Sequence, residues 1–296
     1  MKSLRLRELI SRALTRRLLK WCLSRMEGVW CESSVSAVFL GDVVSRGIML
    51  DGIFEKRPLE LLETEIFPRL PRDSIALDVG ANIGNHCRFF VPHFSKVIAF
   101  EPHPMTATAL KANTIRETND GRVRIFAVGL SDTSGKVDFC FDRSNIGASR
   151  IVSSGNESST QVEVTTLDSL IDDLDPSKVS FIKIDVEGHE SKVIGGAIDF
   201  LSKSDAIVAT EGWYKTYPHI GQHVESLLSS LGYKHFYIPA EQRFKNKFLN
   251  RITRPIRRYE PLHLDKISSF VGKDFDMVIC SKLDLNKMPI LRHEES

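Results

Sequence analysis

Two acidic residues and two glycines near residue 80 have the spacing of a nucleoside-binding loop. A mostly apolar run over residues 75–79 leads into Gly80-Ala-Asn-Ile-Gly84, and Asp78 stands two positions before the first glycine. A second apolar run, residues 96–100, ends in Glu101, which follows Asp78 by 23 positions (101 − 78). In a β-α-β unit of this kind the glycines let the ligand approach the backbone. The acid after the second strand accepts hydrogen bonds from the ribose hydroxyls.

The glycine spacing distinguishes between nucleoside ligands. Dinucleotide-binding loops read G-x-G-x-x-G and direct a helix N-terminus at a pyrophosphate. Here Asn82 takes the place of the middle glycine, and the acid before the loop suits a ligand that carries positive charge. S-adenosylmethionine has an ammonium group, a sulfonium group and a ribose diol, and it has no phosphate. The loop therefore favours S-adenosylmethionine over a nicotinamide dinucleotide, and a tight turn without a ligand is the plain alternative.

A second group of ionisable residues, Asp185-Val-Glu-Gly-His-Glu190, follows another apolar run. Transfer of a methyl group to oxygen requires alignment of donor and acceptor and removal of the acceptor proton. A histidine with a pKa near neutrality can accept that proton, and carboxylates can orient it. We expect His189 to be the base, with Asp185, Glu187 or Glu190 as orienting groups. The alternative is that His189 and Glu190 cap the following helix.

The same carboxylates raise the question of a metal ion. Oxygen ligands suit Mg²⁺ and Ca²⁺, but four candidate ligands within six residues cannot all face one point on a strand-turn. The five cysteines show none of the Cys/His spacings of a zinc site. The sequence therefore predicts S-adenosylmethionine as cofactor and no metal site, with a divalent cation as the lesser alternative.

Five segments, in this order, resemble a known family. They are Asp78-Val-Gly-Ala-Asn-Ile-Gly84, Phe100-Glu-Pro102, Gly129-Leu-Ser-Asp132, Thr166-Leu-Asp168 and Lys183-Ile-Asp-Val-Glu-Gly-His-Glu190. Together they resemble the FkbM family of S-adenosylmethionine-dependent methyltransferases over residues 40–282, and the last segment is the most specific. The resemblance implies a Rossmann-like class I methyltransferase that methylates a hydroxyl of a small molecule or glycan.

Donor and acceptor residues follow from these segments. The family often has Asn where this chain has His103, so no role is transferred to that position. Ser131 and Asp132 follow the third strand, where adenine-binding groups commonly lie, although a turn cap would use the same residue types. The predicted acceptor site contains Asn145, Ser149, Glu211, Trp213 and Tyr214. The predicted donor site contains Asp78, Gly80, Asn82, Gly84, Glu101, Pro102, Asn113, Ser131, Asp132 and Asp185.

The elements that must position these residues alternate along the chain. Strand patterns occur at 75–80, 96–101, 123–129, 179–185, 206–211, 233–239 and 275–281, and helical patterns at 84–94, 105–117, 189–202 and 219–231. This alternation predicts an α/β fold with a mostly parallel seven-stranded sheet, helices on both faces and an antiparallel last strand. Ligands of such sheets bind beyond the carboxyl ends of the strands.

Other segments extend or interrupt that domain. Residues 1–34 are expected to form a basic helical extension, 35–73 a lead-in with a helix near 57–67, and 283–296 a C-terminal tail. The methyltransferase domain is expected over 74–282, with insertions at 131–168 and 241–272. Alternating patterns at 136–141 and 161–165 predict two strands inside the first insertion.

Charge is distributed unevenly along the chain. The net charge is +2, residues 1–25 carry a net +7 and residues 241–261 a net +5, so the remainder carries −10 (2 − 7 − 5). Scattered cysteines, an arginine-interrupted N-terminus and the lack of a long apolar run favour a cytoplasmic protein. An apolar stripe on the N-terminal helix could contact the cytoplasmic face of an anionic membrane, pack on the acidic body or mediate dimerisation. The stripe contains Leu6, Ile10, Leu14, Leu18 and Trp21.

Three rival functions make different demands on the sequence. An NAD-dependent oxidoreductase needs G-x-G-x-x-G, which the loop lacks. A nucleic-acid methyltransferase would suit the basic segments, but the D/N-P-P-Y/F/W sequence of amino-group methylation is missing, so no nucleic acid is expected as partner. A donor-binding but inactive, membrane-associated scaffold would keep the loop, and the presence of Asp185, His189 and Glu190 argues against it. The sequence therefore predicts a methyltransferase and does not name its acceptor.

Overall fold

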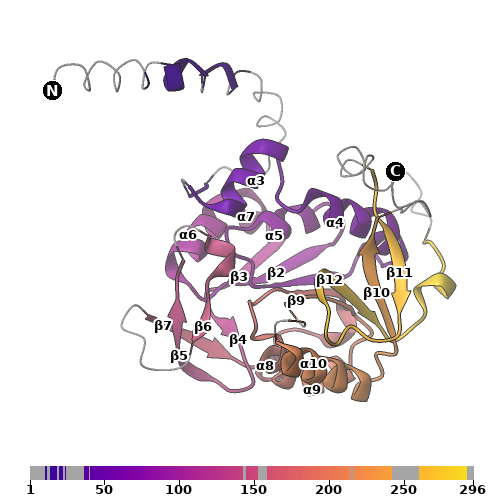
Figure 1. The fold of residues 1–296 in the computed structure, drawn as a ribbon. Helices are drawn as coiled ribbons and strands as arrows, with labels where there is room; N and C mark the ends of the chain where they lie inside the picture. The colour runs from indigo at the N-terminus through magenta and orange to yellow at the C-terminus, as the bar shows by residue number, and fades with distance from the viewer. Residues whose placement is uncertain are drawn as a thin grey trace.

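The computed structural model describes residues 11, 14–18, 20–22, 24, 37–39, 41–142, 145–152, 159–213, 215, 217–241 and 260–291. Its centre is an eight-stranded sheet with the strand order β11-β10-β12-β9-β8-β1-β2-β3. Figure 1 shows this sheet surrounded by helices, with a smaller sheet beside it.

Five neighbouring strands are parallel and bring their carboxyl ends to one edge of the sheet. They are β3 (Val123–Phe126), β2 (Lys96–Phe100), β1 (Ile75–Val79), β8 (Val179–Ile184) and β9 (Ile207–Trp213). The strands are short and mostly apolar because helices cover both faces of the sheet. On the far side, β12 (Asp274–Ser281) runs antiparallel to β9 and to β10 (His235–Ala240). The predicted Rossmann-like fold class and the antiparallel last strand are confirmed.

The predicted number of seven strands is wrong. An eighth strand, β11 (His263–Ile267), pairs antiparallel with β10 inside the segment 241–272 that the sequence suggested to be an insertion. His263, Asp265 and Lys266 make up most of this strand, and all are at least partly exposed at the edge of the sheet. An edge strand of this composition lacks the apolar run by which the other strands were predicted.

Helices cover both faces, as predicted. On the face of Ala76, Val97 and Phe181 lie α4 (Lys56–Leu61), α5 (Asn85–Phe90) and α6 (Pro104–Asn113). On the face of Leu77, Ile98 and Ile182 lie α8 (Glu190–Gly195), α9 (Ile198–Ser202) and α10 (Pro218–Ser230). Short helical segments complete the structure: a π-helical turn Leu62–Ile66, α7 (Ile115–Asn119), and the 3-10 turns Phe67–Arg69, Ile146–Ala148, Asp168–Leu170, Pro176–Lys178 and Leu285–Lys287.

The first insertion, together with β4 just before it, forms a separate four-stranded sheet in the order β4-β7-β5-β6. Its strands are β4 (Gly129–Leu130), β5 (Gly135–Cys140), β6 (Arg150–Val152) and β7 (Thr160–Thr165). The two strands predicted in this insertion are therefore confirmed as β5 and β7, which pair antiparallel. The predicted strand 123–129 ends at Phe126, because the chain then leaves the large sheet to form β4.

A short helix of the lead-in, α3 (Val43–Asp51), joins the lead-in to this insertion. Asp42 caps the helix by accepting a hydrogen bond from Ser45 N at 2.6 Å, and its other oxygen accepts one from Ile146 N at 2.8 Å. Val44 and Ile48 pack in one buried cluster with Ile146. The lead-in and the insertion therefore pack against each other.

The described residues between 11 and 24 are helical, as predicted for the N-terminus. Leu14, Leu18 and Trp21 are 62%, 62% and 58% exposed; Leu6 and Ile10 lie outside the described residues. No helix in the described ranges has both the length and the apolar character needed to cross a membrane. Most of the second basic segment, residues 242–259, also lies outside the described residues.

Candidate active site

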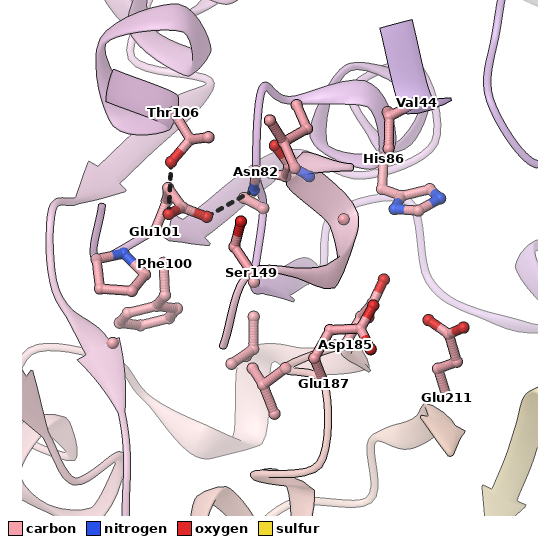
Figure 2. A pocket seen from close by; sticks show the side chains of 18 of the residues that line it. Val44, Asn82, His86, Phe100, Glu101, Thr106, Ser149, Asp185, Glu187 and Glu211 are labelled. Atoms are coloured by element: carbon pink, nitrogen blue, oxygen red, sulfur yellow. Dashed lines mark hydrogen bonds between the residues drawn. The ribbon is translucent and has the colours of Figure 1, made fainter. Parts of the chain in front are cut away.

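A pocket lies beyond the carboxyl ends of β1, β2, β8 and β9 (Figure 2). Its wall is formed by the strand ends, the first turns of α5 and α6, the lead-in and the inserted sheet. Their lining residues include Gly80, Glu101, Asp185 and Glu211 from the strands, Val44 and Glu55 from the lead-in, and Phe139 and Ser149 from the insertion. This is the edge at which ligands bind in open α/β sheets.

Glu101 fixes the shape of the glycine loop. Its Oε2 accepts a hydrogen bond from Asn82 N at 2.9 Å, and its Oε1 accepts bonds from His103 N at 2.9 Å and Thr106 Oγ1 at 2.7 Å. Figure 2 shows two of these three bonds. A carboxylate has about four acceptor positions, so Glu101 keeps about one for a ligand. Burial raises the pKa of Glu101 although these hydrogen bonds oppose the shift.

Gly80 brings the glycine loop into direct contact with the end of β8. Its φ is +84°, and a Cβ at this position would lie 1.9 Å from the carbonyl oxygen of Asp185. Glycine is therefore required here both by its backbone conformation and by the space. Gly84 also has a positive φ, +91°, but a Cβ there would meet Leu110, and Gly84 is not among the lining residues of the pocket.

Strained backbone gathers around this pocket. The non-glycine residues with positive φ in the described part of the chain are Glu55 (57°), Asn82 (52°) and Glu187 (51°). All three line the pocket. Such conformations cost about 1–3 kcal/mol each and cluster at functional sites, which supports this pocket as the active site.

Asp185 and Glu211 form a carboxyl pair beside a buried lysine. Lys183 Nζ lies 2.7 Å from Asp185 Oδ2. Burial raises the pKa of Glu211 to about 11, and the neighbouring Asp185 adds to the effect, so Glu211 holds a proton at neutral pH. Burial opposes the charge of Asp185, but Lys183 and the hydrogen bond from Glu211 outweigh it and lower the pKa of Asp185.

Asp78 lies beneath the pocket. It is fully buried and is not among the lining residues. Neither carboxylate oxygen has a well-formed hydrogen bond within the described residues, although the Cys87 amide is near enough to lower the pKa slightly. Burial raises the pKa of Asp78, against the opposing effects of His86 and Lys183. Asp78, which the sequence placed in the donor site, is thus a buried acid that lies near charged side chains.

His86 and Glu55 form an acid–base pair in the wall that the sequence analysis missed. His86 is in the first turn of α5, and Glu55 directly precedes α4. His86 Nε2 lies 3.0 Å from Glu55 Oε2, at an angle outside the range of a well-formed hydrogen bond. His86 is only 7% exposed. Thirty residues of chain separate the two side chains, and the left-handed backbone of Glu55 has no sequence signature.

His189 lines the pocket from the turn after β8. Its Nε2 lies 2.9 Å from Ser131 Oγ, which in turn donates to Asp132 Oδ1 at 3.1 Å. Burial, with a contribution from Lys192, lowers the pKa of His189 to about 4, so its ring is neutral at neutral pH. The structure thus brings the expected base together with the expected adenine-side residues. Ser131 and Asp132 themselves are not among the lining residues.

Glu190 is a buried carboxyl in the same turn and is not among the lining residues. Its Oε1 accepts a hydrogen bond from Gly188 N at 3.0 Å. Its Oε2 has no partner within the described residues. Burial raises the pKa of Glu190 to about 7. Glu190 is therefore placed to hold the turn that carries Glu187 and His189.

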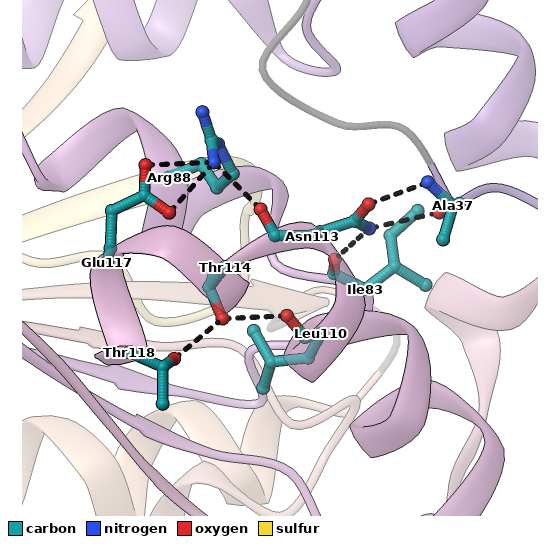
Figure 3. Close-up of polar contacts among 8 residues, drawn as sticks. All are labelled: Ala37, Ile83, Arg88, Leu110, Asn113, Thr114, Glu117 and Thr118. Carbon is teal, nitrogen blue, oxygen red and sulfur yellow. Dashed lines mark hydrogen bonds and ion pairs between the residues drawn. The ribbon is translucent and has the colours of Figure 1, made fainter. Parts of the chain in front are cut away.

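Asn113 holds the lead-in against the glycine loop (Figure 3). Its Oδ1 accepts a hydrogen bond from Ala37 N at 2.6 Å, and its Nδ2 donates to Ala37 O at 3.0 Å and to Ile83 O at 2.7 Å. Asn113 is not among the lining residues. The structure thus places this expected donor residue outside the pocket, in a structural position.

The expected acceptor residues are partly brought together. Asn145, Ser149 and Glu211 line the pocket, as does Pro102 of the expected donor site. The side chain of Trp213 and all of Tyr214 lie outside the described residues. The sequence analysis missed a further set of lining residues, for which no motif exists: Val43, Val44, Phe54, Thr106, Phe139, Phe141 and Ile151.

The described residues contain no group of three or more His, Cys, Asp or Glu side chains placed to hold a metal ion. The carboxylates at the end of β8 are instead engaged with Lys183, with Glu211 and with backbone amides.

Comparisons with known proteins give a family match and several relatives. The family model described as the methyltransferase FkbM domain matches residues 78–235. The chain is 33% identical over 136 residues to the hexuronic acid methyltransferase AglP of Haloferax volcanii, covering 46% of this chain and 55% of that protein. It is 28% identical over 150 residues to the 2-O-methyltransferase NoeI of Sinorhizobium fredii, covering 45% and 60%. The chain thus spans little more than half the length of these curated relatives.

Among solved structures, the chain is similar to a methyltransferase FkbM from Methylobacillus flagellatus. The TM-score is 0.45 at 14% identity, over 87% of this chain and 59% of that one.

Proposed function

Because this chain belongs to the FkbM methyltransferase family, we propose that it transfers a methyl group from S-adenosylmethionine to a hydroxyl of a small molecule or glycan. One observation carries the proposal. The glycine loop held by Glu101 opens into the same pocket as a histidine and several carboxyl groups from three other segments. Donor binding and proton removal therefore have residues at one place.

The residues at the glycine loop fit the proposed donor. Glu101 keeps about one acceptor position for a ribose hydroxyl. Asn82 Oδ1 is buried without a hydrogen-bond partner within the described residues and lies in the pocket wall, so it offers a further acceptor. Phe100, Leu130 and Phe139 supply apolar wall for a flat base. When bound, S-adenosylmethionine would supply the electrophilic methyl group.

The predicted catalytic residues take their roles from this arrangement. Ionised Asp185 lies in the wall where it can attract the positive charge of the donor. Glu211 donates its proton to Asp185 and keeps acceptor positions for an acceptor hydroxyl. His189, fixed by Ser131, and Glu187 complete the end of β8. Asp78, Ser131, Asp132 and Glu190 act from behind the wall.

A sugar hydroxyl is the acceptor class that the relatives suggest, since the two names concern a hexuronic acid and a 2-O position. The pocket supports an oxygen acceptor because its wall includes carboxyl, amide and hydroxyl groups. Asn145, Ser149 and Glu211 line it and can form hydrogen bonds with a polyhydroxylated ring.

A second candidate is a donor-binding protein without turnover that associates with a membrane. One observation favours membrane contact: Leu14, Leu18 and Trp21 are exposed on a helix whose segment, residues 1–25, carries a net +7. Basic residues near an anionic surface contribute about 1 kcal/mol each. Packing on the acidic body or dimerisation would use the same side chains.

Calorimetric titration tests the donor, and a transfer assay tests the activity. We expect S-adenosylmethionine to bind and NADH not to bind. With labelled donor, we expect label to pass to at least one member of a panel of methyl glycosides and phenols. Binding of NADH alone would contradict the methyltransferase proposal. Donor binding without transfer to any acceptor would favour the inactive scaffold.

A further inference from the structure

The pocket wall holds one ionisable pair to which the proposed function has given no role, His86 and Glu55. Both residues line the pocket, and Figure 2 shows His86 facing the space that Asp185, Glu187 and Glu211 border from below. His86 Nε2 lies 3.0 Å from Glu55 Oε2. Within the described residues, Nδ1 of His86 forms no hydrogen bond. His86 therefore lies beside a carboxylate without a well-formed hydrogen bond to it, so a ring nitrogen is available to accept a proton.

The other candidate bases in the wall are poorer proton acceptors. Asp185 is bound to Lys183 at 2.7 Å and to Glu211, which holds a proton. His189 is held through one ring nitrogen, with Nε2 2.9 Å from Ser131 Oγ, so this contact alone does not exclude it. However, burial and Lys192 lower the pKa of His189 to about 4. A group with such a low pKa has little affinity for the proton that an alcohol must release.

We infer that His86, oriented by Glu55, is the general base that takes the proton of the acceptor hydroxyl. The inference rests on the proposed function and names a different base from the one expected by sequence. It is also consistent with the fold, because His86 follows the glycine loop directly and is therefore positioned by the loop that would hold the donor.

The step balances with the groups already named. The acceptor O–H bond breaks and its proton goes to the free nitrogen of His86. The acceptor oxygen forms a bond to the methyl carbon while the bond from that carbon to the donor sulfur breaks. The products are a methyl ether, S-adenosylhomocysteine and the imidazolium of His86, which then releases its proton to solvent.

Acids from three elements lie around His86. Glu55 of the lead-in lies 3.0 Å from its Nε2, and Asp78 of β1 and Asp185 of β8 are close enough for the ring to lower their pKa values.

The chain offers a matched control for His86. His93 lies just beyond the same helix and contacts Glu63, with Nε2 3.5 Å from Oε1, but it is not among the lining residues. We expect His86→Ala to lose about 10²–10⁴ in turnover, with donor affinity within a factor of three of wild type. His93→Ala should keep turnover. Added imidazole should restore part of the turnover of His86→Ala alone.

Two further variants keep the test decisive. If His86→Ala does not fold, His86→Gln preserves the volume of the ring and should show the same loss. Glu55→Gln should lose about tenfold to a hundredfold, because the ring remains while its orienting charge is removed. The acidic limb of the pH profile of kcat/KM should be present in wild type and absent in His86→Gln.

Three outcomes separate the hypotheses. Full turnover in His86→Ala together with a large loss in His189→Ala would make His189 the base and overturn the inference. Loss of turnover without imidazole rescue, and with an unchanged pH profile, would give His86 a structural role and also overturn it. A wild-type chain that binds S-adenosylmethionine but methylates no acceptor contradicts the proposed function first, and the inference with it.

Discussion

The two ends of the pocket are built in opposite ways. At the end proposed to bind the donor, Glu101 accepts three hydrogen bonds from residues within 19 positions of it in the chain. At the end proposed to bind the acceptor, Glu55, His86, Asp185 and Glu211 come from four distant segments and contact one another through charge. Hydrogen bonds between residues close in sequence therefore hold the proposed donor end in shape without a ligand. The acceptor end is a collection of buried charges that tertiary structure holds together.

From this difference we expect donor affinity to depend on one end of the pocket and turnover to depend on the other. A hydrogen-bonded loop is preorganised, so ligand binding there requires little rearrangement. Buried charges are costly to hold, and their pKa values are displaced in the directions that acid–base chemistry uses. Changes at the donor end should therefore alter binding, and changes at the acceptor end should alter turnover and pH dependence.

Gly80→Ala should have the largest effect because it affects both ends. The new Cβ would lie 1.9 Å from the Asp185 carbonyl oxygen, at a φ of +84°. Backbone strain and overpacking together should destabilise the fold by about 3–5 kcal/mol and abolish measurable donor binding. Denaturant unfolding and calorimetric titration measure the two effects. Gly121→Ala is the control for backbone strain alone, since Gly121 has a φ of +74°, nothing lies within 4 Å of a Cβ there, and it does not line the pocket. If the folded fraction of Gly80→Ala bound donor as well as Gly121→Ala does, the contact between the two loops would not shape the proposed donor end.

Glu190→Gln should show how much the buried carboxylate behind the proposed acceptor end lowers the free energy of unfolding. Its folded pKa of about 7 exceeds the ordinary value of 4.5, so the folded state binds the proton more tightly. The stability from this group is fully present below pH 4.5 and is lost as the pH rises to about 7. The loss is about 3 kcal/mol (2.5 units at 1.36 kcal/mol each).

The measurement is the free energy of unfolding at pH 5 and pH 8. Glu190→Gln should be more stable than wild type at pH 8 and show a smaller difference at pH 5. Glu163→Gln, at an exposed position of β7, should match wild type at both values. Equal stability of Glu190→Gln and wild type at pH 8 would show that the Glu190 carboxylate is not destabilising.

Glu101→Ala should weaken S-adenosylmethionine binding by one to two orders of magnitude, because hydrogen bonds to charged groups contribute roughly 1.5–3 kcal/mol. Part of the loss should come from the loop, since Asn82, His103 and Thr106 all lose their acceptor. Glu117→Ala removes a carboxylate that binds Arg88 outside the pocket and should leave donor affinity unchanged. Calorimetric titration of both variants with S-adenosylmethionine measures the donor affinity. Unchanged affinity in folded Glu101→Ala would show that this end of the pocket does not bind the donor.

Removal of residues 1–25 should have the smallest effect on either end. The described part of this segment has exposed apolar side chains at Leu14, Leu18 and Trp21, and none of them lines the pocket. Donor affinity and turnover should therefore stay the same. With anionic vesicles, the full-length chain should float and the shortened one should not. The assay is done at low salt because salt screens the electrostatic contact. Equal flotation of the two chains would exclude this helix as the membrane contact.

The elements of the large sheet could be predicted because each signal lies within a few residues. The parallel strands are apolar runs, and Gly80 and Glu101 end them at the expected spacing. β11 was missed because a partly exposed edge strand has no apolar run. Asn113 was placed in the donor site, yet its side chain bonds to Ala37, 76 residues away in the chain. No local pattern contains that contact.

The sequence by itself determined the fold class, the position of the glycine loop and the family, because these depend on apolar periodicity and on spacing within single β-α-β units. Only the tertiary structure decided which charged residues face the ligand. It brought Glu55 of the lead-in to His86, and it set Glu211 beside Asp185. It also turned Glu190 into a buried support behind the wall. The physical reason is that burial and charge coupling depend on distance in space, so that the pKa values and partners of these groups exist only once the segments have packed together.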